Sequence, residues 1–341
     1  MSKILVTGGL GFIGSHTVVE LVHAGYEPVI VDNLSNSNPK ILDQLEKILG
    51  HKPAYYQLDL CYEHQIAELV AKEPDLEGII HFAASKAVGE SVQKPLMYYK
   101  NNFFSLINLL NAYSGKKLNF VFSSSCTVYG QPDELPVTEN APVKKAQSPY
   151  GNTKQVAEEI LQDVIASGSA YKIVSLRYFN PVGAHQSALI GELPIGIPQN
   201  LVPFITQTVI GKRQKLTVYG NDYNTPDGSN VRDYIHVVDL AKAHVAALKY
   251  METAPDFTGY DMFNIGTGKG SSVLEVIKAF EKTTGEKLNY EIGPRRLGDV
   301  EQVWGDVTKA AEKLKWKTEL DVDQMMLTAW NWEKYINQNP L

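Results

Sequence analysis

Close to the start of the chain stands Thr7-Gly8-Gly9-Leu10-Gly11-Phe12-Ile13-Gly14, a glycine-rich segment between two regular patterns. Residues 4–7 form the apolar run of a buried strand, and residues 14–25 have the spacing of a helix that ends at a glycine. A strand, a glycine-rich turn and a helix in this order are typical of a dinucleotide-binding βαβ unit. In such a turn no Cβ atom stands in the way, so backbone N–H groups at the start of the helix reach a pyrophosphate.

The glycine spacing is specific only in this context. Gly9, Gly11 and Gly14 fit one dinucleotide-binding spacing, and Gly8, Gly11 and Gly14 fit another. A glycine-rich turn without a ligand is the alternative. The position between a strand and a helix, at the start of the chain, favours a nucleotide.

Asp32 is the second feature of this unit. It ends the second expected strand, 18 residues after Gly14. A carboxylate there accepts the ribose hydroxyls of adenosine and repels a 2′-phosphate, so it predicts NAD rather than NADP. The alternative is an ordinary turn aspartate before Asn33.

Short apolar runs alternate with helical patterns through the first half of the chain. The expected strands are residues 4–7, 28–32, 54–59, 78–82, 119–123 and 173–177. Strands that alternate with helices imply right-handed βαβ crossovers and a parallel sheet. The sequence therefore predicts an α/β fold, a doubly wound parallel sheet of the Rossmann type with a smaller C-terminal substrate-binding domain.

The change of pattern near residue 180 suggests where the two domains divide. We expect residues 1–180 to form the NAD-binding domain and residues 181–341 to form mainly the substrate domain. Residues 234–268 are expected to return to the first sheet as a helix and a strand. Residues 181–233 are rich in Gly, Pro and Asn, which predicts loops that close over a ligand between the domains.

Composition excludes several classes of protein. A net charge of −6 at pH 7 offers no basic excess for nucleic acid or an anionic membrane. The two cysteines, Cys61 and Cys126, lack the spacing of a disulfide framework or a zinc site, so no metal is expected. No apolar run approaches the roughly 18–20 residues that span a bilayer, and the first residues do not resemble a signal peptide. These features predict a cytoplasmic protein.

Tyr150 and Lys154 are the candidate catalytic pair. The spacing Tyr150-Gly-Asn-Thr-Lys154 puts a phenol and an ammonium group one helical turn apart on one face. A free tyrosine has a pKa of about 10 and is a poor base near neutrality. A nearby lysine and the positive nicotinamide ring would stabilise the phenolate, and a pKa lower by about 3 units needs about 4 kcal/mol of such stabilisation.

This spacing also arises by chance, and Tyr113 and Lys117 repeat it. Context separates the two matches. Tyr150 opens a helix just after Ser148-Pro149, and an expected strand that ends in three serines, residues 123–125, precedes it. A serine hydroxyl can therefore join Tyr150 at the carboxyl edge of the sheet, whereas Tyr113 has no such partner. The alternative for Tyr150 is a tyrosine on a helix surface.

Together these residues resemble the extended short-chain dehydrogenase/reductases, and within them the UDP-hexose 4-epimerases. Similar stretches span nearly the whole chain. They are Val6-Thr-Gly-Gly with Gly11-Phe-Ile-Gly-Ser-His, Val31-Asp-Asn-Leu-Ser-Asn-Ser, Ile80-His-Phe-Ala-Ala-Ser-Lys-Ala-Val-Gly-Glu-Ser-Val, Phe122-Ser-Ser-Ser-Cys-Thr-Val-Tyr-Gly, Ser148-Pro-Tyr-Gly-Asn-Thr-Lys, Leu176-Arg-Tyr-Phe-Asn-Pro-Val-Gly-Ala-His, Tyr219-Gly-Asn-Asp-Tyr, Val231-Arg-Asp-Tyr-Ile-His-Val and Pro294-Arg-Arg-Leu-Gly-Asp. The long middle stretches are more specific to the epimerases than the glycine-rich turn is.

The resemblance implies a role for each matching position. Ser125, Tyr150 and Lys154 would be catalytic, with Ser125 and Tyr150 on either side of the sugar C4 oxygen and Lys154 on the nicotinamide ribose. Besides Tyr150 and Lys154, the cofactor would be held by Gly8, Gly11, Phe12, Ile13, Gly14, Asp32, Asn33, Leu34, Ser35, Asn36, Ser37, Asp59, Leu60, Phe82, Ala83, Ala84, Ser85, Lys86, Asn101 and Phe179. The UDP-sugar would meet Ser125, Asn180, Asn200, Leu201, Thr217, Val218, Tyr219, Arg232, Arg296, Asp299 and Val303.

The residue types suit these roles. Arg232 and Arg296 offer forked donors to a diphosphate, and Tyr219 offers a face to uracil. Simpler alternatives are an ion pair between Arg232 and Asp233, and a solvated turn at Arg295-Arg296.

The resemblance also implies a redox-neutral reaction. The Tyr150 phenolate would take the proton of the sugar 4-hydroxyl while hydride passes from C4 to NAD. The 4-keto sugar would then turn over and receive the hydride on its opposite face. An enzyme of this kind has to retain reduced cofactor and ketone between the two transfers, so tightly bound NAD is expected.

Two positions bear on the exact activity. Related nucleotide-sugar dehydratases carry an acid pair where this chain has Cys126-Thr127, which argues against dehydration. The position of Val303 is bulky in some family members and small in others, and it limits the space at the sugar C2 substituent. The small Val303 suggests that N-acetylated UDP-hexoses are also accepted.

Two other functions remain open from the sequence. One is another nucleotide-sugar epimerase, for example one that acts on a UDP-uronate. The other is a dinucleotide sensor without catalysis, which would have no need of Ser125, Tyr150 and Lys154 together. The resemblance further implies a homodimer paired through helices of the first domain, for which residues 96–113 and the helix of Tyr150 are candidates.

Overall fold

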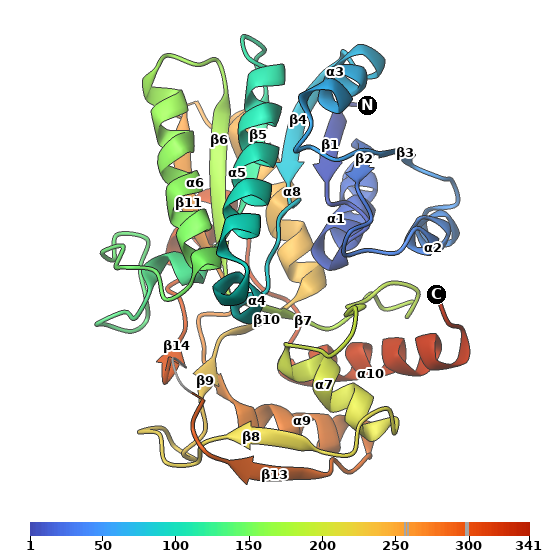
Figure 1. Ribbon diagram of the computed structural model, residues 1–341, viewed down its shortest axis with the longest axis vertical. Helices are drawn as coiled ribbons and strands as arrows, with labels where there is room; N and C mark the ends of the chain where they lie inside the picture. The colour runs from blue at the N-terminus through green and yellow to red at the C-terminus, as the bar shows by residue number, and fades with distance from the viewer. Residues whose placement is uncertain (256, 258, 297–299) are drawn as a thin grey trace.

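The chain folds around a seven-stranded parallel sheet with helices on both faces (Figure 1). The computed structural model describes residues 1–255, 257, 259–296 and 300–341. In spatial order the strands are β11 (Tyr260–Ile265), β6 (Lys172–Tyr178), β5 (Asn119–Ser125), β4 (Leu76–His81), β1 (Lys3–Thr7), β2 (Glu27–Asp32) and β3 (Ala54–Gln57). The predicted α/β fold with a doubly wound parallel sheet is confirmed.

Strand β1 lies at the point where the strand order reverses. It pairs with β2 on one side and with β4 on the other, and Thr7 at its end is opposite both Val31 and His81. The chain leaves β1 and β2 toward one side of the sheet and β4 toward the other. Ligands of doubly wound folds bind at the carboxyl ends of the strands at such a reversal.

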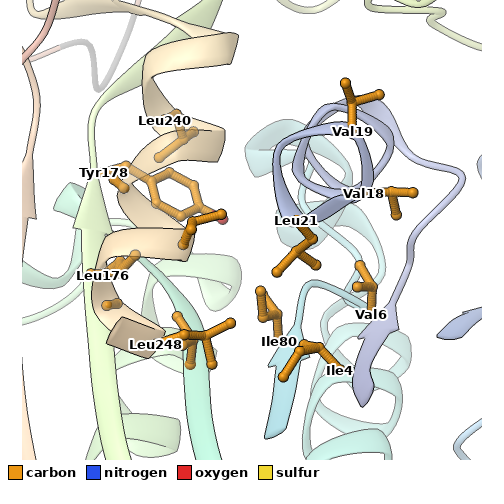
Figure 2. Packing of buried hydrophobic residues seen from close by; sticks show 14 of the residues in the cluster. Ile4, Val6, Val18, Val19, Leu21, Ile80, Leu176, Tyr178, Leu240 and Leu248 are labelled. Atoms are coloured by element: carbon orange, nitrogen blue, oxygen red, sulfur yellow. The ribbon is translucent and has the colours of Figure 1, made fainter. Parts of the chain in front are cut away.

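Apolar side chains pack the helices onto both faces of this sheet. Helices α1 (Phe12–His23) and α8 (Val237–Thr253) cover one face, and α3 (Glu63–Lys72), α5 (Pro95–Ala112) and α6 (Pro149–Ala166) cover the other. Figure 2 shows Leu21 of α1 over Ile80 of the sheet, with Leu248 of α8 nearby. Burial on both faces explains why the strands of the sheet are nearly continuous apolar runs.

The remaining elements gather below the carboxyl ends of the strands (Figure 1). They are α7 (Leu201–Val209), α9 (Val273–Thr284), α10 (Val322–Gln338), the strand pairs β7 (Asn180–Val182) with β10 (Tyr234–His236) and β8 (Leu216–Tyr219) with β13 (Tyr290–Gly293), and the small sheet of β12 (Ser271–Ser272), β9 (Val231–Arg232) and β14 (Gln302–Val303). A separate hydrophobic cluster holds α7, α9 and α10 together. Near the main sheet lie the short elements α2 (Lys40–Leu49), α4 (Val88–Gln93), η1 (Cys126–Tyr129) and η2 (Ala310–Leu314), the last of which packs against α8 and β11.

Residues 181–233 lie mostly outside helices and strands, as their Gly, Pro and Asn content predicts, but apolar residues of α7 and β8 within them are buried in that separate cluster. The third strand ends at Gln57 rather than at Asp59. The Asp59 carboxylate accepts a hydrogen bond from Cys61 N at 2.9 Å, which bends the chain into a turn.

Within the described ranges, none of the helices is long and apolar enough to cross a membrane.

Candidate active site

The glycine-rich turn is shaped by backbone contacts that leave no room for side chains. Gly8 has φ +69°, in the left-handed region, and donates to Val31 O at 2.7 Å. A Cβ atom on Gly14 would lie 2.3 Å from Gly8 O, so the start of α1 packs directly on the turn. No side chain caps α1 at its N-cap residue, Gly11. The first N–H groups of the helix can therefore bind an anion.

Asp32 ends β2 beside this turn. Its carboxylate accepts hydrogen bonds from Leu10 N at 3.1 Å, Leu34 N at 2.9 Å and Ser37 Oγ at 2.7 Å. These three donors fix the carboxylate in one orientation. An ionised carboxylate has about four acceptor sites, so it can still accept a bond from a ribose hydroxyl.

Strand β5 and helix α6 bring together the three candidate catalytic residues. Ser148 caps α6 by accepting from Gly151 N at 3.1 Å, which starts the helix directly before Tyr150. One turn later, Lys154 Nζ donates to the carbonyl oxygen of Ser123 at 2.6 Å and lies 5.9 Å from the centre of the Tyr150 ring. Ser125, at the end of β5, lies close enough to Tyr150 to lower the pKa of its phenol.

Burial governs the charges of this trio. It raises the pKa of Tyr150 to about 12, which the neighbouring Ser125 offsets only in part. Burial also lowers the pKa of Lys154 to about 7, partly offset by the carboxylate of Glu158. The expected lowering of the Tyr150 pKa is therefore not found in the protein by itself. The Lys154 ammonium is turned toward Ser123 O, and burial of the phenol is the main influence on the pKa of Tyr150.

Tyr113 and Lys117 have the same sequence spacing as Tyr150 and Lys154 but not the same geometry. Tyr113 is fully buried at the end of α5, and the helix stops before Lys117. The two residues therefore do not share a helical face.

Other candidate cofactor residues line the strand ends on either side of β1. Phe82 and Ala83 follow β4 and hydrogen-bond to Thr7 at the end of β1. Ser85 is held by Asn101 and Asn102 of α5. Asp59 and Leu60 follow β3, and Phe179 follows β6, where its N–H donates to Ile265 O at 3.2 Å.

Candidate substrate residues come from several elements below the sheet. Asn200 precedes α7 and donates to Glu192 at 2.6 Å, and Lys86 Nζ lies 4.0 Å from the same carboxylate. Tyr219 ends β8, is 45% exposed, and has the Arg296 guanidinium 5.5 Å from its ring centre. Asn180, Leu201, Thr217 and Val218 belong to β7, α7 and β8, whereas Asp299 lies outside the described residues.

Arg232 and Val303 are direct neighbours. They are paired residues of β9 and β14, and Val303 is 8% exposed. Arg232 donates to Val231 O at 2.8 Å, whereas the Asp233 carboxylate accepts from Thr267 N at 2.8 Å and Gly268 N at 3.2 Å. Asp233 thus holds a turn, and the alternative of an ion pair with Arg232 is wrong.

Sequence reasoning missed a buried ion pair behind the trio. Glu158, one turn after Lys154 on α6, binds Arg177 of β6 with Nη2–Oε2 at 2.5 Å. Both side chains are at most 4% exposed. Two charged residues in otherwise apolar patterns, one of them four positions after Lys154, were the available signal.

The geometry fits a dinucleotide. The turn at Gly8–Gly14 packs directly against the start of α1, which no side chain caps, and Asp32 presents an oriented carboxylate next to it. In the described part of the chain, no group of three His, Cys, Asp or Glu side chains is arranged to hold a metal ion.

Comparisons with known proteins extend over nearly the whole chain. The family model of GDP-mannose 4,6 dehydratase matches residues 5–328. The UDP-glucose 4-epimerase of Yersinia pestis is 48% identical over 338 residues, which cover 99% of this chain and 98% of that protein.

Two solved structures agree in both sequence and shape. The UDP-glucose 4-epimerase of Stenotrophomonas maltophila, with bound NAD and formylated UDP-arabinopyranose, is 44% identical with a TM-score of 0.95 and covers 99% of this chain and 100% of that one. The UDP-glucose 4-epimerase of Bifidobacterium longum, in complex with NAD+ and UDP, is 46% identical with a TM-score of 0.93 and covers 100% of both chains.

Proposed function

This chain belongs to the UDP-glucose 4-epimerase family, within the wider family of GDP-mannose 4,6 dehydratase, and we infer that it interconverts UDP-glucose and UDP-galactose with NAD as its cofactor. The observation that carries the inference is the meeting of Ser125, Tyr150 and Lys154 at the carboxyl edge of the sheet, in a chain 48% identical to a full-length epimerase. Cys126 and Thr127 offer no acid or base next to Ser125, which supports epimerisation over dehydration.

The residues of the site divide the work of the reaction. Bound NAD would supply a hydride acceptor at the sugar C4 and a positive charge close to Tyr150. The Tyr150 oxygen accepts the proton of the 4-hydroxyl and gives it back when the product forms. Ser125 donates a hydrogen bond to the same sugar oxygen, and the Lys154 ammonium favours the charged form of the Tyr150 phenol.

We assign the anchoring of the nucleotide to the elements below the sheet. Arg232 and Arg296 supply donors for the diphosphate, and the exposed ring of Tyr219 packs against uracil. The sugar then turns over between the two transfers while UDP stays bound. This division of labour agrees with a two-domain chain, residues 1–180 for NAD and mainly 181–341 for the UDP-sugar.

N-acetylated UDP-hexoses are proposed as further substrates. Val303 is small and pairs with Arg232, and a bulky side chain at this position would take up space beside a proposed substrate residue. Similar rates with UDP-glucose and UDP-N-acetylglucosamine are expected, and Val303→Tyr should abolish only the second reaction. Wild-type protein that does not turn over the N-acetyl sugar would refute this extension.

We also propose that the protein is a homodimer of the reducing cytoplasm. Both cysteines are free thiols, which suits a reducing compartment. Support for the dimer comes from large apolar side chains that α4 and α5 expose, among them Leu96 at 81% and Phe104 at 48%.

An epimerisation assay without added cofactor tests the proposed function. Purified protein receives UDP-galactose, and proton NMR follows the anomeric and C4 signals. Conversion to an equilibrium mixture with UDP-glucose is expected, because tightly bound NAD is purified with the protein. If no conversion follows even after NAD is added, the substrate assignment is wrong, and UDP-uronates and other nucleotide sugars become the next candidates.

A further inference from the structure

Three consecutive serines at the end of β5 each have different partners. The Ser123 carbonyl accepts from Lys154 Nζ, and the Ser123 hydroxyl bonds to the Tyr178 hydroxyl. The Ser124 hydroxyl donates to Glu158, and Ser125 lies beside Tyr150. Three successive turns of α6, which carry Tyr150, Lys154 and Glu158, thus all meet the last three residues of β5, and this fixes the position of the helix on the strand.

Several hydrogen bonds from Arg177 hold the carboxylate of Glu158. Arg177 Nε donates to its two carboxylate oxygens at 3.0 and 3.2 Å, and Arg177 Nη2 donates to Oε2 at 2.5 Å. The Arg177 guanidinium also lies 4.9 Å from the Tyr129 ring centre and donates to the Tyr129 hydroxyl at 3.1 Å. Because Arg177 is itself fixed, the position of the Glu158 carboxylate is fixed as well.

Glu158 is the carboxylate that acts on Lys154. From the same helix, Lys154 faces Tyr150 and Glu158, and from β4 it faces the imidazole of His81, which burial keeps neutral. From β5 it meets the Ser123 carbonyl and, at 4.8 Å, the ring of Phe122. Glu158, four residues away on the same face, is the carboxylate among these neighbours, and Arg177 of β6 is the buried cation that pairs with it.

We propose that Glu158 is a positioning residue for the epimerase reaction. It ties the helical turn that carries Lys154 to the end of β5, and its negative charge keeps the Lys154 ammonium charged beside the substrate. This inference rests on the proposed function. Burial lowers the pKa of Lys154 to about 7, so loss of the Glu158 charge would leave the lysine largely neutral near neutral pH. A neutral lysine no longer stabilises the Tyr150 phenolate.

The test compares pH profiles of epimerisation. Glu158→Gln alone leaves the Arg177 guanidinium buried without a counter-charge and can prevent folding. The double variant Glu158→Gln with Arg177→Met removes both charges, and Glu159→Gln, an exposed neighbour on the same helix, is the matched control.

In the double variant we expect the alkaline limb of the kcat profile to move to lower pH by roughly half a unit or more, with KM within about twofold of wild type. The control should keep the wild-type profile. A loss of kcat by the same factor at every pH, or an unchanged profile, would show a purely structural role and overturn the proposal.

A second measurement does not depend on the substrate. The protein is purified with lysines labelled with ¹³C at Cε, and the signal of Lys154 is identified by its disappearance in Lys154→Arg. Its titration midpoint should lie at lower pH in the double variant than in wild type and in Glu159→Gln. An unchanged midpoint overturns the role of Glu158 even in an active enzyme. A shifted midpoint in a protein that epimerises nothing would overturn the proposed function and leave the coupling of Glu158 to Lys154 in place.

Discussion

At the scale of single residues, we propose that the phenol of Tyr150 is the group that moves the proton. We expect Tyr150→Phe to lower kcat about 10²- to 10⁴-fold, because the general base is removed while the ring and its packing stay. NAD content should not change. The matched control is Tyr113→Phe, which removes a buried hydroxyl without a hydrogen-bond partner and should leave kcat within about twofold. Retention of more than a tenth of the activity by Tyr150→Phe would assign the proton transfer to another group.

Asp32 makes the second residue-scale prediction. Asp32→Asn keeps the size of the side chain but removes the charge that accepts from Leu34 N and Ser37 Oγ. Loss of charge-assisted hydrogen bonds to the ribose should weaken NAD binding by about 1.5–3 kcal/mol. Binding of NADP should weaken less or improve, since the repulsion of the 2′-phosphate disappears. Dissociation constants for both cofactors, measured by calorimetry on protein freed of NAD, check this, and equal losses for both would contradict it.

The meeting of Ser125, Tyr150 and Lys154 could be predicted because strand order and helical spacing fix it. The charge state of the trio could not. The pKa of Tyr150 rises through burial, and burial depends on how α6 packs on β5, which no local pattern encodes. For the same reason the ion pair of Glu158 and Arg177 was missed, since the two residues meet only in the folded sheet.

At the scale of elements, the turn between β1 and α1 depends on close contact of backbones. Gly14→Ala would put a Cβ atom 2.3 Å from Gly8 O, and neither backbone segment can move without shifting α1 from the sheet. We expect a loss of stability of roughly 1–3 kcal/mol and a protein that no longer retains NAD on purification. Gly89→Ala in α4 is the control, because its Cβ atom would meet nothing within 4 Å. Denaturant unfolding and the absorbance of released NAD measure both effects, and wild-type NAD content in Gly14→Ala would contradict the prediction.

Most strands of the main sheet could be predicted to within two residues because their apolar runs are buried on both faces. The small sheet of β12, β9 and β14 could not. Its strands have two residues each, as in Val231–Arg232 and Gln302–Val303, and arise from contacts between distant segments. Helix α7 was missed because the glycines and prolines before it, in residues 181–200, hid its apolar face.

At the scale of the whole molecule, buried histidines make the folded state sensitive to acid. Burial lowers the pKa of His16 and His81 to about 3 and that of His236 and His244 to about 4, from an ordinary value of 6.5. Between pH 6.5 and about 4 the unfolded chain binds protons that the folded chain does not. The free energy of unfolding therefore falls as the pH falls, by about 1.4 kcal/mol per pH unit for each such histidine.

His244→Phe tests this dependence, because it keeps a ring between Phe82 and Tyr178 and removes one titrating group. The melting temperature of the variant should fall less steeply than that of wild type between pH 6.5 and 4.5. His51→Gln, at an exposed position, should leave the slope as in wild type. Parallel slopes for His244→Phe and wild type would mean that this ring is not kept neutral by folding.

The last property of the whole molecule is its assembly. Helices α5 and α6 lie side by side on one face (Figure 1), and α4 and α5 expose Val92, Leu96, Met97, Phe104 and Ile107 there. Apolar side chains gathered along adjacent helices are expensive to leave in water, and a second copy with the same surface would bury them around a twofold axis.

Light scattering coupled to size exclusion should therefore give twice the chain mass for the wild type. The double variant Leu96→Asp with Phe104→Asp should give one chain mass, because each copy would have to bury the new carboxylates of its partner. Ile195→Asp with Ile197→Asp is the matched control, since these side chains are also largely exposed but belong to the loop before α7, and it should remain dimeric. The exposed apolar side chains of α4 and α5 lie next to the two helices that carry candidate site residues, α5 with Asn101 and α6 with Tyr150. The monomeric variant should therefore lose NAD faster than the control. A monomeric wild type with full activity would show that this apolar surface has no part in assembly.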